Sequence, residues 1–392
     1  MYIARLLEKD IKTGARYFPV VAIRGPRQSG KTTLAKKLFP DHEYVSLEDI
    51  DLRTAALNDP RSFLELHHNK KGLIIDEFQY APQLLSYIQT IVDTEKKHGY
   101  YILTGSQNFL MNQAITQSLA GRVSLHTLLP LSIHELDTQA LLPARVETIL
   151  FKGLYPAIYT KKIPPTRLYS QYMQTYIERD VRQLAHVGDL STFQTFLKLT
   201  AERIGQLVNF TEIGRECRIS DQTVRRWLSI LEASYIIFLL HPYEKTLGKR
   251  LVKSSKLFFY DPGLACYLLE ISEKELLTSP KRGGIFESLI ISEIIKQFYT
   301  KGLEPSIYFW QDKEKHEIDC IVRRGSQLMA IEIKAGRTPN PSFFSGLAYW
   351  QSLQTTAKPK NYVVYAGDRK RISGYKDLIS WQSLQNILGF IR

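Results

Sequence analysis

The stretch 20–38 constrains the fold of this chain more than any other segment. An apolar run at 20–23 predicts a buried strand, and residues 33–38 predict a helix. The segment between them, Gly-Pro-Arg-Gln-Ser-Gly-Lys-Thr, has the spacing G-x-x-x-x-G-K-[ST]. Glycines let such a backbone curl around one anion, and the helix N-terminus adds the positive end of its dipole. Strand, loop and helix in this order predict an α/β fold with a phosphate-binding loop, the P-loop.

The residues of this loop have distinct expected roles. Lys31 would reach the β- and γ-phosphates of a nucleotide such as ATP, and the Thr32 hydroxyl would hold Mg²⁺. A Gly-rich turn before an ordinary helix is the alternative, but it does not require both flanking elements. The expected nucleotide-binding residues are Gly25, Pro26, Arg27, Gln28, Ser29, Gly30, Lys31, Thr32 and Thr33.

A second apolar run, at 73–75, ends in Asp76 and Glu77. Open parallel sheets bind their ligands at the carboxyl ends of the strands. Asp76 would complete the Mg²⁺ shell with Thr32, and Glu77 would orient or deprotonate the attacking water. Acids also end strands without any function, but an acidic pair that follows a P-loop predicts nucleotide hydrolysis.

Two further residues are candidates for catalysis beside Lys31 and Glu77. Ser106 follows a strand expected at 100–105 and could sense the γ-phosphate, with Thr104 and Asn108 as neighbours; a plain polar turn is the alternative. Arg122 precedes a short strand expected at 123–128. It could stabilise transition-state charge in a neighbouring subunit, which would require a homo-oligomer, or it could be a surface arginine.

Composition bounds the class of protein. A length of 392 residues exceeds one ordinary core, so we expect several domains. Three widely spaced cysteines without metal-ligand spacing suit a reducing cytoplasm. The N-terminal residues lack a signal-peptide pattern, and no apolar run reaches membrane-spanning length. We therefore expect a cytoplasmic protein with no membrane partner.

The net charge of +13 is unevenly distributed. Residues 1–135 carry 16 Lys and Arg against 14 Asp and Glu, whereas residues 136–392 carry 36 against 25. A basic second part suggests a polyanionic partner, with nucleic acid such as DNA as the first candidate. Generic basicity that serves solubility is the alternative.

The residues from 191 to 240 predict a winged helix. Helices are expected at 193–204 and 209–217, a third begins at Ser220, and a strand follows at 236–240. Winged helices also bind proteins, so DNA and protein contacts remain equal alternatives. The expected nucleic-acid contacts are Gln222, Thr223, Arg225 and Arg226. A basic run follows at Lys245, Lys249, Arg250, Lys253 and Lys256.

A second group of acids lies near the C-terminal end of the chain. Glu287 is in the first turn of an expected helix at 285–299, and strands are expected at 306–310, 317–322 and 328–334. Residues two apart in a strand share a face, so Glu332 and Lys334 lie side by side, and Asp319 on the adjacent strand can join them. Such carboxylates would hold a second Mg²⁺ or Mn²⁺, and the lysine would help to activate water for phosphodiester cleavage. Structural ion pairs are the alternative.

Several segments together resemble a known family. They are GPRQSGKTT, LIIDEFQ, ILTGSQNFLM, SLAGRV, LPLSIHEL, GLYP, YIERDV and KLFFYDPGL. In this order they resemble prokaryotic AAA-type P-loop ATPases with a C-terminal DUF4143-like domain. The resemblance implies a RecA-like ATPase core, a helical and winged-helix middle, and a restriction-endonuclease-like region similar to PD-(D/E)xK nucleases. Glu287 would match the helical acid of that nuclease pattern.

The expected organisation is a P-loop ATPase core at 1–135, a helical lid at 136–188, a winged helix at 189–250 and a nuclease-like domain at 251–392. Arg179 and Arg182 could contact the γ-phosphate from the lid, although an ion-pair face on a helix looks the same. The expected function is ATP binding and hydrolysis coupled to a nucleic-acid-directed, nuclease-like domain. The alternative is an ATP-controlled DNA-binding or protein-interaction switch with an inactive nuclease fold.

Overall fold

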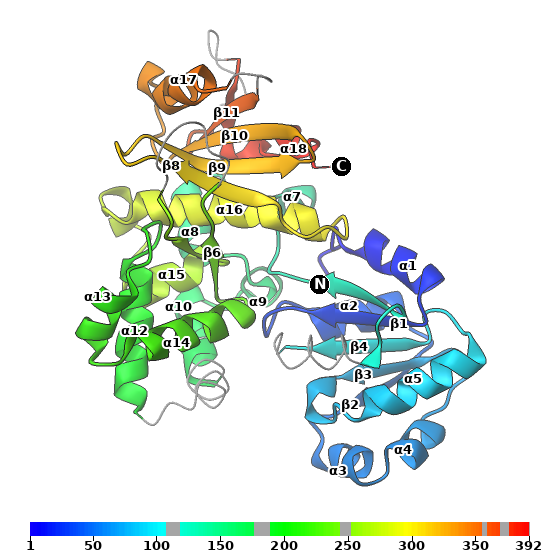
Figure 1. Cartoon of the computed structure of the whole chain (residues 1–392). Helices are drawn as coiled ribbons and strands as arrows, with labels where there is room; N and C mark the ends of the chain where they lie inside the picture. Colours follow the sequence, from blue (N-terminus) through cyan, green and yellow to red (C-terminus); the bar gives the residue numbers. More distant parts are fainter. Residues whose placement is uncertain (107–117, 176–188, 244–251, 355–358, 369–375, 392) are drawn as a thin grey trace. The chain divides into compact units, whose positions relative to one another are not determined.

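The computed structural model describes the chain except for residues 107–117, 176–188, 244–251, 355–358, 369–375 and 392. These residues form two compact units (Figure 1). The first unit comprises residues 1–131, 233–235 and 299–303. The second comprises residues 132–232, 236–298 and 304–392.

The first unit alternates strands and helices. Its elements are α1 Glu8–Tyr17, β1 Val20–Arg24, α2 Lys31–Leu38, β2 Glu43–Ser46, α3 Ile50–Asn58, α4 Pro60–Leu66, β3 Leu73–Asp76, the 3₁₀ turn η1 Phe78–Tyr80, α5 Leu84–Glu95, β4 Tyr101–Gly105 and β5 Val123–Thr127. The break between α3 and α4 lies at Asp59, whose side chain accepts the Ser62 N–H and caps α4. Pro60 lacks an N–H and fits the first turn of a helix, so the predicted interruption there is explained.

The five strands form one parallel sheet in the order β2-β3-β4-β1-β5. Alternate side chains of β1 enter opposite cores: Val20 and Ala22 pack with residues of α3, α4 and α5, whereas Val21 and Ile23 pack with residues of α1 and α2. Both faces of the sheet are therefore covered, which explains why its strands read as continuous apolar runs. The predicted α/β fold with a parallel sheet is confirmed.

The second unit begins with helices. They are α7 Ile133–Thr138, α8 Val146–Lys152, α9 Pro156–Thr160, α10 Pro165–Tyr172, α12 Leu190–Glu202, α13 Phe210–Cys217, α14 Asp221–Ala233, α15 Pro262–Leu268 and α16 Arg282–Tyr299, with the 3₁₀ turn η3 Glu275–Leu277. Between α14 and α15, β6 Ile237–Leu240 pairs antiparallel with β7 Lys256–Phe259. Three helices followed by an antiparallel pair have the order that a winged helix requires, and the assignment stays a prediction. The predicted boundary at 250/251 falls between these two paired strands.

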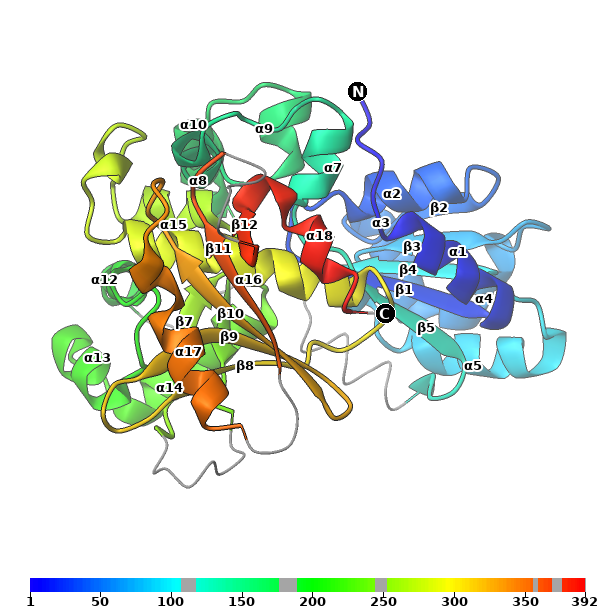
Figure 2. The same cartoon turned by 90° about the horizontal axis from the view of Figure 1, so that it is seen from above.

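The same unit ends in a mixed sheet. Its elements are β8 Ile307–Gln311, β9 Glu317–Arg324, β10 Gln327–Lys334, η4 Pro341–Phe344, α17 Ser345–Ser352, β11 Lys360–Tyr365, β12 Leu378–Ser380, η5 Trp381–Ser383 and α18 Gln385–Leu388. The strand order is β12-β11-β10-β9-β8, antiparallel from β8 to β10 and parallel from β10 to β12. Helix α17 lies on one face of the sheet (Figure 2). Its Trp350 belongs to the same buried cluster as Trp310 and Ile318. In Figure 1, α16 runs along the other face.

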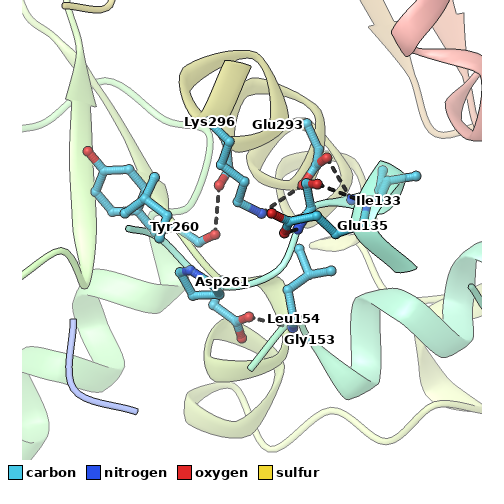
Figure 3. A network of polar contacts seen from close by, with 12 residues as sticks. Ile133, Glu135, Gly153, Leu154, Tyr260, Asp261, Glu293 and Lys296 are labelled. Atoms are coloured by element: carbon cyan, nitrogen blue, oxygen red, sulfur yellow. Dashed lines mark hydrogen bonds and ion pairs between the residues drawn. The ribbon is translucent and has the colours of Figure 1, made fainter. Parts of the chain in front are cut away.

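A buried polar network joins the helices of the second unit (Figure 3). Glu293 of α16 accepts the Ile133 N–H at 2.8 Å and the Lys296 ammonium at 2.7 Å. Asp261 accepts the N–H groups of Leu154 at 2.7 Å and Leu264 at 2.9 Å. The donors to each carboxylate offset part of the cost of its burial, although burial still raises the pKa values of Glu293 and Asp261.

In the part of the chain that the structure describes, no helix combines the length and apolar character that a bilayer crossing needs.

Candidate functional site

The loop between β1 and α2 has a backbone that requires glycine. Gly25 has φ +150° and Gly30 has φ +96°, both in the region that side chains disfavour. A Cβ on Gly25 would lie 2.1 Å from the Leu128 carbonyl oxygen. The loop therefore passes so close to the segment after β5 that only glycine fits at its first position.

Lys31, the first residue of α2, is buried against this loop. Its ammonium donates to the carbonyl oxygens of Gly25 at 3.0 Å and Pro26 at 2.8 Å. Burial lowers the pKa of Lys31, and the nearby carboxylates of Glu77 and Asp76 oppose that shift. The site thus holds a buried lysine beside two acids at the carboxyl ends of the strands.

The Asp76 carboxylate ends β3 and collects three hydroxyl groups. Thr32 donates to its Oδ2 atom at 2.8 Å, Tyr44 donates to the same atom at 2.9 Å, and Thr104 donates to Oδ1. Burial, followed by the charge of Asp76, raises the pKa of Tyr44 to about 12, so its phenol keeps its proton at neutral pH. Asp76 is consequently fixed beside Thr32 by strands β2 and β4.

Glu77 has a left-handed backbone with φ 52°. This turn directs its carboxylate toward two donors: Ser106 Oγ at 3.0 Å and the Gln79 side-chain amide. Ser106 follows β4 and is buried. The structure thus brings Lys31, Thr32, Asp76, Glu77 and Ser106 together at the carboxyl ends of β1, β3 and β4.

The chemistry of these residues fits magnesium and a triphosphate. A hydroxyl and a carboxylate lie side by side at Thr32 and Asp76, and oxygen ligands are those that Mg²⁺ prefers. In the loop, the fully buried Ser29 hydroxyl has no hydrogen-bond partner among the described residues. A buried hydroxyl without a partner is costly, and a phosphate oxygen would satisfy it.

Three residues of this site were not predicted from the sequence. Arg5 donates to the carbonyl oxygens of Ser29 at 2.8 Å and Leu129 at 2.6 Å. It therefore connects the P-loop to the segment that follows β5. Tyr44 holds Asp76, and Gln79 holds Glu77. Only Gln79 had a local signal, because it lies two residues after Glu77.

Arg122 does not join the site of its own chain. It precedes β5, whereas the loop 25–32 follows β1, and the two strands are parallel neighbours. A strand of this length spans about 16 Å. Arg122 therefore lies at the amino ends of the parallel strands, whereas the P-loop lies at their carboxyl ends. There it makes a two-pronged ion pair with Asp93 of α5, at 2.6 and 2.8 Å. Action on a neighbouring subunit stays a prediction.

The four residues expected to contact nucleic acid lie at the start of α14. Gln222, Arg225 and Arg226 are exposed. Thr223 contributes to the N-terminal cap, because its N–H and its hydroxyl contact Ser220 Oγ at 3.1 and 2.9 Å. The Arg225 guanidinium lies 3.7 Å from the ring centre of Phe210. Six other residues named from the sequence lie outside the described residues: Asn108, Arg179, Arg182, Lys245, Lys249 and Arg250.

The expected cluster at Glu287, Asp319, Glu332 and Lys334 is assembled in the second unit. Lys334 forms an ion pair with Glu332 and lies 3.6 Å from Asp319 Oδ2. The β9–β10 register ends at Ile331 opposite Cys320, and the Asp319 carboxylate then accepts the Ile333 N–H at 2.7 Å. At this end of the β9–β10 pair, the Asp319 side chain therefore accepts a backbone N–H of β10.

The charged groups in this cluster shift one another's pKa values. Burial, followed by the charge of Asp319, raises the pKa values of Glu287 and Glu332 to about 8. Burial would lower the pKa of Lys334, but Asp319 and Glu332 raise it above its ordinary value. The carboxylate oxygens suit Mg²⁺ or Mn²⁺ in kind. Among the described residues, however, the group whose possible ligand atoms all lie within 4.8 Å of one another is Asp312, Glu314 and His316. The cluster at Glu287, Asp319 and Glu332 does not meet this criterion.

Two residues of the cluster were not expected to belong to it. Glu317 of β9 pairs with Lys256 of β7, and Gln311 donates to its other oxygen at 2.7 Å. The spacing of Glu317 and Asp319 in one strand was a signal for the first. Lys256 had been assigned to a basic run, and only the tertiary structure brings it here.

Comparison with known families finds a match in the N-terminal part of the chain and another in its C-terminal part. Residues 17–137 match the family model described as "AAA domain", and residues 282–384 match "Domain of unknown function (DUF4143)". The chain carries an AAA domain followed by a DUF4143 domain. Residues 144–275 match a third model, "Domain of unknown function (DUF8612)". The P-loop, Asp76, Glu77 and Ser106 all lie within the AAA domain.

Two curated proteins are similar over most of the chain. They are the "Uncharacterized protein Mb2031c" of Mycobacterium bovis and the "Uncharacterized protein Rv2008c" of Mycobacterium tuberculosis. Each is 29% identical over 331 residues, which cover 83% of this chain and 72% of the relative. Their descriptions assign no activity.

Solved structures with partial similarity include a Walker-type ATPase of Pyrococcus abyssi and the Thermotoga maritima RuvB Holliday junction branch migration motor. The first is 14% identical and covers 68% of this chain and 96% of its own, with a TM-score of 0.47. The second is 15% identical and covers 59% and 88%, with a TM-score of 0.31.

Proposed function

We propose that the AAA domain binds ATP with Mg²⁺ and hydrolyses it. One observation carries the proposal: a buried lysine, a hydroxyl–carboxylate pair and a second carboxylate meet at the carboxyl edge of one parallel sheet. Lys31 would neutralise phosphate charge, and Thr32 with Asp76 would hold Mg²⁺. A bound Mg²⁺ supplies charge stabilisation as the γ-phosphoryl group leaves.

Glu77 would act on the attacking water. Its carboxylate can accept a proton or orient a water by hydrogen bonding, and Ser106 and Gln79 limit where that carboxylate points. Ser106 follows the adjacent strand and would report the presence of the γ-phosphate. Ser106, one of the two donors that fix Glu77, would therefore couple the position of Glu77 to the nucleotide.

Binding is tested by titrating a fluorescent ATP analogue into the purified full chain. Lys31→Ala should weaken binding at least about tenfold, since the interaction of a buried ammonium with phosphate is lost. Lys37→Ala removes an exposed lysine of the same helix and should leave the affinity unchanged. Equal affinities for wild type and Lys31→Ala would refute the assignment of the loop.

We further propose that ATP turnover in the AAA domain controls a nucleic-acid-directed effector in the remainder of the chain. The supporting observations are the basic excess of residues 136–392 and the carboxylate–lysine cluster at Glu287, Asp319, Glu332 and Lys334. There the carboxylates would hold Mg²⁺ or Mn²⁺ and Lys334 would help to orient water at a phosphodiester. Incubation of plasmid DNA with the protein and Mn²⁺ tests this; cleavage should occur and should be lost in Asp319→Ala.

The second candidate is an ATP-controlled DNA-binding or protein-interaction switch whose nuclease-like domain does not cut. The exposed basic start of α14 favours it. This function gives salt-sensitive DNA binding without cleavage, weakened by the double change Arg225→Ala and Arg226→Ala. Absence of DNA affinity at moderate salt would leave protein partners as the target of the switch. Measuring ATPase rate with and without DNA, alongside the cleavage assay, separates these possibilities.

A further inference from the structure

Lys256 is a buried cation inside the carboxylate–lysine cluster. Its side chain is 7% exposed, and its ammonium forms an ion pair with Glu317 Oε1. The other Glu317 oxygen accepts the Gln311 amide at 2.7 Å. Both oxygens of Glu317 are therefore occupied by donors of the protein itself.

The backbone fixes this lysine. Lys256 begins β7, where it is opposite Leu240 of β6, and it also bridges to Leu207. The ring of Phe309 on β8 lies 5.4 Å from its ammonium. The cation thus enters the cluster from a strand outside the β8–β12 sheet.

The cluster contains two lysines and four carboxylates. Lys334 lies between Glu332 and Asp319, and Lys256 pairs with Glu317 while Glu287 and Asp319 also act on its charge. Burial would lower the pKa of Lys256, but these three carboxylates raise it above its ordinary value, so the side chain stays an ammonium. Each ammonium neutralises carboxylate charge that a divalent cation would also neutralise.

We propose that Lys256 is an internal counter-cation that competes with a divalent metal for the carboxylates of this cluster. The inference rests on the metal-binding role proposed for Glu287, Asp319 and Glu332. When a metal ion enters, the Lys256 ammonium withdraws from Glu317, because two cations that share buried carboxylates repel each other at low dielectric. A strand of the preceding helical region thereby limits metal occupancy of the DUF4143 domain.

The competing interpretation is that Lys256 positions Glu317 for the metal. The two interpretations predict opposite changes in metal affinity when Lys256 is replaced. Removal of a competitor strengthens metal binding, whereas removal of a positioning residue weakens it.

The test is Mn²⁺ binding to the full chain, measured by the electron paramagnetic resonance signal of free Mn²⁺ without ATP or DNA. Lys256→Met keeps an apolar stem and removes the charge, and it should lower the Mn²⁺ Kd at least tenfold. Lys256→Arg keeps the charge and should bind like wild type, as should Lys274→Met, which removes an exposed lysine elsewhere in the unit. The gained binding should disappear when Asp319→Asn is added to Lys256→Met.

An unchanged or higher Kd in Lys256→Met overturns the proposal, as does binding that Asp319→Asn does not affect. If Lys256→Met unfolds, the double variant Lys256→Met, Glu317→Gln removes both charges of the ion pair and should show the same tighter binding. The nuclease proposal fails separately: wild type and Lys256→Met would then leave DNA intact with Mn²⁺ bound, while the difference in Kd persists.

Discussion

At the scale of single residues, Asp76 is the point where the nucleotide site is held in place. Three hydroxyl groups converge on its carboxylate from α2, β2 and β4. Only one of them, Thr32, belongs to the P-loop motif. The orientation of the expected Mg²⁺ ligand therefore depends on residues that carry no motif of their own.

Tyr44→Phe tests this dependence. The change removes the phenol that donates to Asp76 Oδ2 and leaves the ring, which lies 3.3 Å from the Lys36 ammonium. Loss of an outer-shell hydrogen bond to a metal ligand weakens metal use about tenfold or more. We expect ATP turnover at limiting Mg²⁺ to fall by about that factor and to recover as Mg²⁺ is raised. Tyr87→Phe, a change of the same kind on α5, should have no effect; equal Mg²⁺ dependence in all three proteins would contradict the role of Tyr44.

At the scale of elements, Asp261 connects helices that are distant in sequence. Its Oδ2 atom accepts the Leu154 N–H, and its Oδ1 atom accepts Leu264 N–H and the Tyr169 hydroxyl at 2.6 Å. Both oxygens are therefore acceptors for groups on the α8–α9 connection, α10 and α15. No uncharged residue of the same shape can accept on both sides.

Asp261→Asn should destabilise the second unit. An amide has one acceptor oxygen, so one buried donor loses its partner, at a cost of about 1–3 kcal/mol. Urea unfolding followed by circular dichroism measures the change. Asp137→Asn alters an exposed aspartate of α7 and should shift the midpoint little. An Asp261→Asn protein as stable as wild type would show that the network contributes no net stability.

The elements also show what could be predicted from the sequence. The loop 25–32 and the pair Asp76-Glu77 were recognisable because their signals are local: a fixed spacing and an adjacent apolar run. Arg5 and Tyr44 were not recognisable, because Arg5 contacts Leu129 from a great distance in sequence and Tyr44 reaches Asp76 from another strand. From the sequence, Lys256 is recognisable only as part of a basic run, because its burial is decided by packing and not by the neighbouring residues.

At the scale of the whole molecule, two chemical clusters lie in two compact units. The AAA domain contains the P-loop site, and the DUF4143 domain contains most of the carboxylate–lysine cluster. The excess of positive charge belongs to residues 136–392. This division favours nucleotide turnover in one unit and an effector in the other.

Assembly is tested at Arg122. Its ion pair with Asp93 and its place at the far edge of the sheet predict that Arg122→Ala changes ATP turnover less than about twofold, as expected for an exposed pair. Arg61→Ala, another exposed arginine of the same unit, is the matched control. A loss of tenfold or more that depends on protein concentration would instead assign Arg122 to the site of a neighbouring copy.

We propose above all that Glu77 prepares water for attack on ATP. The most direct measurement is phosphate release from saturating ATP by wild type, Glu77→Gln and the exposed-site control Glu65→Gln, each with nucleotide binding measured in parallel. We predict that Glu77→Gln binds ATP with near wild-type affinity and releases phosphate at least about 100-fold more slowly, because the amide cannot take a proton. The Glu65→Gln protein should turn over normally. Normal phosphate release by Glu77→Gln would contradict the account.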